Sequence, residues 1–136
     1  MGRFQLYQRD DQFFEDLVWH LCFRLLGAGT EKFAVGKDGA KDARFTGTAQ
    51  CFPSNESRWI GTTIIQAKHK KSPVASCSDS DFGTIMRKEI VRVAELKKLG
   101  KLDHYVCFTN RKRTGVKGDA LQDELRVASG LPSLLI

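Results

Sequence analysis

The sequence lacks the features that define several classes of protein. Its four cysteines, Cys22, Cys51, Cys77 and Cys107, are widely spaced and form no CxxC pair. This spacing matches neither a zinc site nor a dense disulfide framework, so we expect a reducing, cytoplasmic compartment. No apolar run approaches the roughly 18 residues that a membrane-spanning helix needs, and residues 1–11 lack the apolar core of a signal peptide. We therefore expect no membrane partner.

What the chain does contain is typical of one globular domain. Of its 136 residues, 41% are hydrophobic and 28% are charged. A chain of this length can bury a sizeable core. We expect residues 1–136 to form a single domain. Because they end on the apolar residues SLLI, we also expect them to be the N-terminal part of a longer protein.

Positive charge is concentrated in the second part of the chain, whose total net charge is +6. Residues 1–60 carry 8 Lys/Arg and 8 Asp/Glu, whereas residues 61–136 carry 14 Lys/Arg and 8 Asp/Glu. The later part therefore holds the whole excess. This asymmetry is compatible with a surface that faces a polyanion, and equally with a basic, soluble domain that has no such partner.

The hydrophobic pattern predicts an α/β protein with the element order αβββαβα. Helices are expected at 11–26, at 82–99 and from Asp119 to about 128, and strands at 30–35, 41–47, 59–68 and 104–109. Asp10 or Asp11 is the expected N-cap of the first helix. The first two strands should form a hairpin, and the helix between the last two favours a parallel crossover. The result would be a three-layer sandwich with a mixed central sheet.

Three polar residues near strand ends are the strongest sign of a functional site. Side chains alternate along a strand, so Gln66 and Lys68 share one face of 59–68. Burying an amide and an ammonium at the end of so apolar a strand requires partners, and Asp42 on the neighbouring strand is the expected one. Together these groups could bind a divalent metal and face a phosphate. The spacing alone is weak, because a polar strand end that faces solvent would look the same.

Glu15 is an unusual residue in the first helix. Val18 and Cys22, three and seven residues further on, place its carboxylate on the apolar stripe, where it would point toward the core or toward a site. Glu15 also lies in the first turn, where the helix dipole favours a carboxylate that reaches solvent. Both interpretations stay open at this point.

Four short motifs follow one another in the chain between residues 13 and 128. They are FEDLV at 14–18, DGAKD at 38–42, QAK at 66–68 and YVCFTN at 105–110. In this order they resemble the PD-(D/E)XK restriction-endonuclease-like superfamily, and most closely its Mrr-like branch. Two positions depart from the family pattern: Ala40 replaces a glycine, and Gln66 replaces an acidic residue and so removes one charge from the site. Asp38 is expected to be a turn residue rather than a ligand.

The resemblance implies a restriction endonuclease-like fold and a metal-dependent active site. It assigns catalysis to Asp42, Gln66, Lys68 and Glu15. Mg²⁺ or Mn²⁺ would be bound by Asp42, by Gln66 and by the backbone carbonyl of Ala67, with Glu15 contributing directly or through water. Lys68 would position or activate the attacking water.

Basic residues follow the third and fourth strands, where ligand crevices of such sheets lie. We expect phosphate contacts from Lys70, Lys71, Arg111, Lys112 and Arg113, with His69 in a flanking role and Asn110 either ordering its loop or touching the nucleic-acid backbone. Each of these charges, taken alone, is more typical of a solvated surface.

The resemblance thus implies a DNA endonuclease that hydrolyses phosphodiester bonds, on double-stranded DNA with little sequence specificity. Similar domains stand at the N-terminus of prokaryotic defence proteins, including STAND NTPases. This implies an effector in antiphage defence, with further domains in the same chain and a dimer or higher oligomer when active. The alternatives are a non-catalytic nucleic-acid-binding or oligomerisation module on the same fold, and a nuclease that acts on RNA or single strands.

Overall fold

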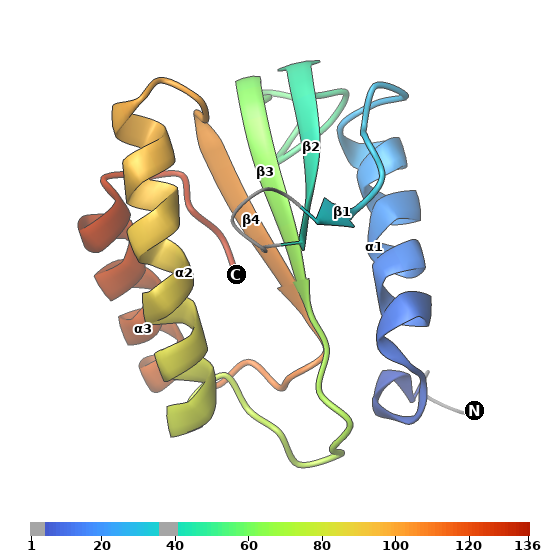
Figure 1. Ribbon diagram of the computed structural model, residues 1–136, viewed down its shortest axis with the longest axis vertical. Helices are drawn as coiled ribbons and strands as arrows, with labels where there is room; N and C mark the ends of the chain where they lie inside the picture. The colour runs from blue at the N-terminus through green and yellow to red at the C-terminus, as the bar shows by residue number, and fades with distance from the viewer. Residues whose placement is uncertain (1–4, 36–40) are drawn as a thin grey trace.

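The computed structural model describes residues 5–35 and 41–136 (Figure 1). Its elements are the 3₁₀ helix η1 (Leu6–Gln8), α1 (Asp11–Leu25), β1 (Ala34–Val35), β2 (Lys41–Thr48), β3 (Ile60–Lys68), α2 (Ser80–Lys98), β4 (His104–Thr109) and α3 (Gly115–Ser129). Apart from η1, this order is the predicted one. The α/β class is therefore confirmed.

The four strands form one mixed sheet in the order β1-β2-β3-β4. β2 and β3 run antiparallel, with Ala43 opposite Ile65, and β3 and β4 run parallel, with Gln66 opposite Cys107. The parallel pair is joined through α2, as the crossover prediction required. This register brings the ends of β2, β3 and β4 that carry the candidate residues to one part of the sheet.

β1 is shorter than the strand predicted at 30–35, although it does pair antiparallel with β2. The reason lies in the residues that precede it. The Thr30 hydroxyl donates to the carbonyl of Gly27 at 2.8 Å, and the Trp19 indole N–H donates to the carbonyl of Thr30 at 3.1 Å. These bonds tie Thr30 to α1 and to the turn that follows it. The next residue, Glu31, donates its backbone N–H to the carbonyl of Arg44 in β2 at 2.8 Å, but the regular ladder begins only at Ala34.

Figure 1 shows three layers, with α1 on one face of the sheet and α2 and α3 on the other. The alternation of side chains along the strands explains this arrangement, because neighbouring residues pack into the two hydrophobic cores on opposite faces of the sheet. Ile65 packs with α1 residues such as Val18, whereas Ile64 packs with Met86 of α2 and Leu125 of α3. Cys22 and Cys107 are buried in these two cores. In the part of the chain that the structure describes, no helix has the length and apolar character of a membrane span.

The helix ends show one confirmed prediction and one that was wrong. Asp10 is the N-cap of α1, and its side chain accepts a hydrogen bond from the backbone N–H of Phe13 at 2.8 Å. Asp119, however, does not cap α3, which begins at Gly115. The two glycines of this segment have low helix propensity, but Gly118 is buried, and a Cβ there would lie 3.1 Å from Arg113 Nε. Close packing therefore places a glycine inside the helix.

Two isoleucines of β3 provide a test of this layering. Ile65 is 0% exposed and Ile60 is 67% exposed. We expect Ile65→Ala to lower the free energy of unfolding by about 2–5 kcal/mol, because it removes buried methyl groups and leaves a cavity. Ile60→Ala should change it by less than about 0.5 kcal/mol. Urea denaturation measures both, and equal losses in the two variants would contradict the burial described here.

Candidate functional site

Asp42 and Gln66 are in direct contact on the face of the sheet that α2 covers. Ala43 pairs with Ile65 across the strands, which sets Asp42 beside Gln66, and Gln66 Nε2 donates to Asp42 Oδ1 at 2.9 Å. Lys68 lies two residues further along β3 and therefore on the same face. The structure thus brings together the three polar residues that the sequence singles out.

Glu89 of α2 joins this group and was missed by the sequence analysis. One of its carboxylate oxygens accepts from Gln66 Nε2 at 2.9 Å and the other from Lys68 Nζ at 3.1 Å. A signal for it exists in the sequence, because Met86 and Val93, three residues before and four after, are buried. A carboxylate between two buried positions of a helix requires polar partners on the facing sheet.

The surroundings of Glu89 stabilise its ionised form. Burial acts to raise the pKa of its carboxyl, but the hydrogen bonds from Gln66 and Lys68 and the positive charges of Lys68 and Arg92 outweigh it, and the pKa is lowered. Glu89 is therefore a carboxylate at neutral pH.

Arg92, three residues further along α2, also joins this group. Its Nη1 lies 2.9 Å from Asp42 Oδ2, and its Nη2 lies 2.9 Å from Asp42 Oδ1. The same Nη2 lies 3.4 Å from Glu89 Oε2. The guanidinium thus binds Asp42 with two parallel hydrogen bonds, which is the strong geometry for this pair, and also reaches Glu89. We refer to Asp42, Gln66, Lys68, Glu89, Arg92 and Tyr105 as the polar cluster.

Tyr105 of β4 determines how the amide of Gln66 is oriented. The Tyr105 hydroxyl donates to Gln66 Oε1, and the two residues are 0% and 1% exposed. Burial raises the pKa of Tyr105 well above its usual value, so the hydroxyl keeps its proton. The amide nitrogen is left to face two carboxylates, to which it can only donate. The Gln66 oxygen is thus directed to Tyr105 and its nitrogen to Asp42, and the role of Gln66 as a metal ligand stays a prediction.

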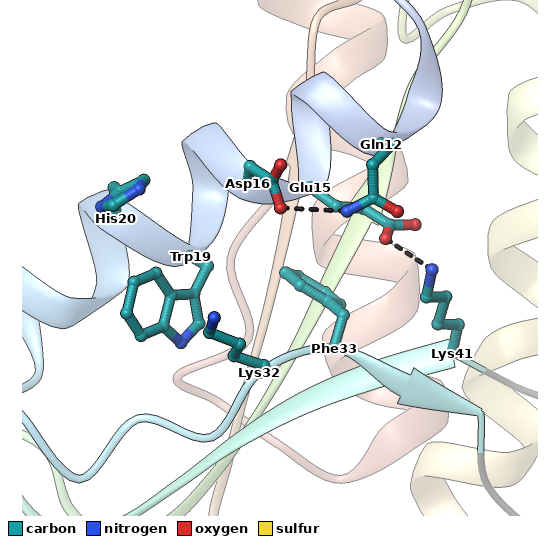
Figure 2. Close-up of a pocket in the computed structure, with 8 residues that line it drawn as sticks. All are labelled: Gln12, Glu15, Asp16, Trp19, His20, Lys32, Phe33 and Lys41. Atoms are coloured by element: carbon teal, nitrogen blue, oxygen red, sulfur yellow. Dashed lines mark hydrogen bonds and ion pairs between the residues drawn. The ribbon is translucent and has the colours of Figure 1, made fainter.

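Glu15 does not join Asp42 in the structure. Its Oε1 lies 2.6 Å from Lys41 Nζ, and Figure 2 shows this ion pair between α1 and β2. Lys41 and Asp42 are consecutive residues of a strand and point to opposite faces of the sheet. The pair forms part of the wall of a cavity of ≈ 330 Å³ on the α1 side, where Trp19 and Lys32 also lie (Figure 2). The Glu15 carboxylate is thus paired with Lys41 rather than placed beside Asp42, and its role at a metal stays a prediction.

A second cavity does bring Glu15 near the end of β3. This space of ≈ 200 Å³ is lined by Glu15, Ala67, Lys68 and residues of α2 and the neighbouring loops. The Ala67 side chain packs against the α1-side core. Glu15 and Lys68 thus face one hollow, although no contact between them is present. Asp38, the expected turn residue, lies outside the described residues.

Two of the residues expected to bind nucleic acid are used inside the protein. The His69 ring is 2% exposed, and its nitrogens lie 2.8 Å from Asp11 Oδ1 and 2.7 Å from the Leu6 carbonyl. The Arg111 side chain is 4% exposed, binds Asp81 with two hydrogen bonds and lies 4.9 Å above the ring of Phe82. His69 and Arg111 therefore cannot offer their side chains to a phosphate, and both expectations are corrected.

The remaining predicted contacts lie at the surface. Lys70, Lys71, Lys112 and Arg113 are exposed, although Lys70 lies 3.7 Å from Asp81 and Arg113 lies 2.6 Å from Asp119. Asn110 donates to the Lys70 carbonyl and accepts from the Lys70 N–H, each at 2.8 Å. Asn110 thus orders its loop, which was the first of its two expected roles.

The donor chemistry of the polar cluster fits a divalent cation. Carboxylate oxygens of Asp42 and Glu89 approach one and the same nitrogen of Arg92, so two hard anionic ligands already converge on a single cationic atom. Over residues 5–35 and 41–136, no group of three or more His, Cys, Asp and Glu side chains is arranged to hold a metal ion. A bound Mg²⁺ would therefore complete its shell with water or phosphate oxygens, as Mg²⁺ commonly does.

The fold and the polar cluster together define a class: an α/β protein in which one end of the mixed sheet, with the helix α2 that covers it, brings together two carboxylates, an amide and two cations. Comparisons of the chain with protein-family models, with curated proteins and with solved structures find no match.

The ionisation of Glu89 leads to a pH test. Because its folded-state pKa is below the usual 4.5, Glu89 contributes stability above that pH, and the contribution is lost as pH falls through the folded-state value. We expect Glu89→Gln to flatten the acid limb of stability as pH falls below the usual pKa of 4.5. Urea unfolding at a series of pH values measures this, with the exposed Glu95→Gln on the same helix as control. An acid limb in Glu89→Gln that equals the wild-type one would contradict the ion-pair assignment.

Proposed function

We propose that this chain is a metal-dependent nuclease domain of the restriction-endonuclease-like kind that hydrolyses phosphodiester bonds in DNA. The observation that carries the proposal is the convergence of Asp42, Gln66 and Lys68, which come from two strands, with the additional carboxylate of Glu89 from α2. Two carboxylates beside a lysine suit phosphodiester hydrolysis, because the carboxylates can hold a cation and the lysine can face the phosphate.

Each residue of the polar cluster has a definite part in the proposal. Asp42 and Glu89 would hold the cation, which supplies charge neutralisation and an acidified water when it is bound. Lys68 is partly exposed and bonds to Glu89, so its ammonium can donate to a phosphate oxygen and stabilise the charge that develops there. Gln66, held by Tyr105, keeps the two carboxylates at a fixed separation.

The surface beside the polar cluster fits a polyanion. Lys70 and Lys71 follow the end of β3, and Lys112 and Arg113 follow the end of the adjacent parallel strand β4. Such groups bind phosphates and carry no base information, which supports DNA binding with little sequence specificity. The resemblance to the PD-(D/E)XK superfamily extends the proposal to a cytoplasmic effector of prokaryotic antiphage defence. This effector would act as a dimer or higher oligomer, together with further domains of its chain.

A second candidate function is a non-catalytic nucleic-acid-binding or oligomerisation module. It is favoured by one observation: each of the four carboxylate oxygens of Asp42 and Glu89 accepts a hydrogen bond from within the protein. A fully satisfied polar network of this kind can serve stability alone. The two candidates differ in whether the polar cluster turns over a substrate.

A cleavage assay separates the candidates. We expect the protein to nick or linearise plasmid DNA in Mg²⁺ or Mn²⁺ and to be inactive in EDTA. Asp42→Asn and Lys68→Ala should each lower the rate by about 100-fold or more, because they remove a ligand and a charge that stabilises the transition state. Matched controls are the exposed Asp123→Asn and Lys88→Ala, which should retain the rate.

Three outcomes of this assay are decisive. Cleavage that persists in EDTA, or in both site variants, would contradict the proposed mechanism. Binding of duplex DNA without cleavage of duplex DNA, single-stranded DNA or RNA would establish the non-catalytic module. Cleavage of RNA or single strands alone would correct the substrate and leave the mechanism in place.

The basic surface is tested by DNA affinity as a function of salt. We expect the double variant Lys71→Ala/Lys112→Ala to bind duplex DNA more weakly. The association constant should also fall less steeply with salt, with the magnitude of the slope of log K against log salt reduced by about one per residue that contacts a phosphate. Lys98→Ala, a surface cation at the far end of α2, should leave the slope unchanged. A slope that is the same in the double variant and the wild type would remove these lysines from the interface.

A further inference from the structure

The guanidinium of Arg92 occupies the place in the polar cluster where a shared cation would sit. Its Nη2 lies 2.9 Å from Asp42 Oδ1 and 3.4 Å from Glu89 Oε2, so one nitrogen is close to both carboxylates. Lys68, the other cation of the polar cluster, contacts Glu89 on its other oxygen, with Nζ at 3.1 Å. A metal ion held jointly by Asp42 and Glu89 would have to use an Asp42 oxygen, and both Asp42 oxygens now bond to Arg92.

The charges of the polar cluster are balanced only while Arg92 remains in place. Asp42 and Glu89 contribute two negative charges, and Lys68 and Arg92 contribute two positive charges, all on side chains that are less than one-third exposed. A divalent cation added to this balanced set would find both carboxylates already neutralised by Lys68 and Arg92, so the site would offer it no net charge attraction. Replacement of the guanidinium by the divalent cation leaves only one positive charge in excess, which an anionic phosphate would neutralise.

From this geometry we infer that Arg92 is an internal competitor of the metal: it holds Asp42 and Glu89 in the metal-free protein and must leave Asp42 when a divalent cation binds. The inference rests on the proposed function for the presence of a metal, and it deepens that function by naming what controls loading of the site. Because the loaded cluster regains neutrality with a phosphate, the metal and the nucleic acid bind with positive cooperativity.

Metal binding to the protein without DNA tests the inference through a readout that does not depend on cleavage. Arg92→Met keeps most of the length of the side chain but removes the charge. We expect it to raise the affinity for Mn²⁺ by about tenfold or more, measured by isothermal titration with MnCl₂, because charge-assisted hydrogen bonds no longer have to be broken. Its thermal midpoint should be lower than that of the wild type without metal and should rise more when Mn²⁺ is added.

A matched control is present on the same helix. Arg87 binds Glu124 with two hydrogen bonds, at 2.6 and 3.1 Å, on the exposed side of α2. Arg87→Met should leave the Mn²⁺ affinity at the wild-type value. Asp42→Asn added to Arg92→Met should abolish the gain, since it removes one of the two carboxylates.

The outcomes distinguish this inference from the proposed function. A folded Arg92→Met with wild-type or weaker Mn²⁺ affinity overturns the competition, whether or not the protein cleaves DNA. Should this variant not fold, Arg92→Lys, which keeps the charge but not the two-pronged geometry, should bind Mn²⁺ more tightly than the wild type, and equal or weaker binding overturns the inference. A gain in Mn²⁺ affinity without cleavage of any nucleic acid supports the competition and contradicts the nuclease.

Discussion

The polar cluster depends on one buried amide. Gln66 lies near the end of β3, an inner strand of the sheet, with almost no solvent exposure, so each of its polar atoms must find a partner inside the protein. Those partners come from β2, α2 and β4, which means that one side chain fixes the positions of three other elements relative to β3. An acidic residue at this position would place a third carboxylate between two others. The neutral amide is what allows Asp42 and Glu89 to approach one another.

Much of the fold follows from residue patterns, and so does the meeting of Asp42, Gln66 and Lys68 in the polar cluster. Strand alternation in 59–68 places Gln66 and Lys68 on one face, and the need to satisfy a buried amide indicates Asp42. Glu89 and Arg92 could not be assigned in this way. Their side of α2 is known only once the helix has a fixed rotation over the sheet, and that rotation is decided by the packing of Met86 and Val93. Local pattern specifies which residues are polar, but tertiary packing decides which of them meet.

The cationic residues after β3 and β4 show where reading charge from sequence fails. A run such as NRKR looks like a uniform positive surface, yet Arg111 is buried against Asp81 and Phe82 while Lys112 next to it is exposed. The cause is again outside the run: carboxylates at the start of α2, 30 residues earlier, lie close enough to take one cation out of solvent. The net charge of a segment therefore overstates the charge that a ligand would meet.

Asn110 has a consequence for whatever binds beside the polar cluster. By bonding to both backbone polar groups of Lys70, it ties the segment after β4 to the segment after β3. The two exit segments are thereby held at a constant separation, as two neighbouring strands would be. Cations mounted on them need not be ordered when a partner arrives, so less conformational entropy is lost in binding than two independent loops would lose. An anion whose charges have the same spacing as Lys70, Lys71 and Lys112 would bind well, and an anion with a different charge spacing would gain little from these lysines.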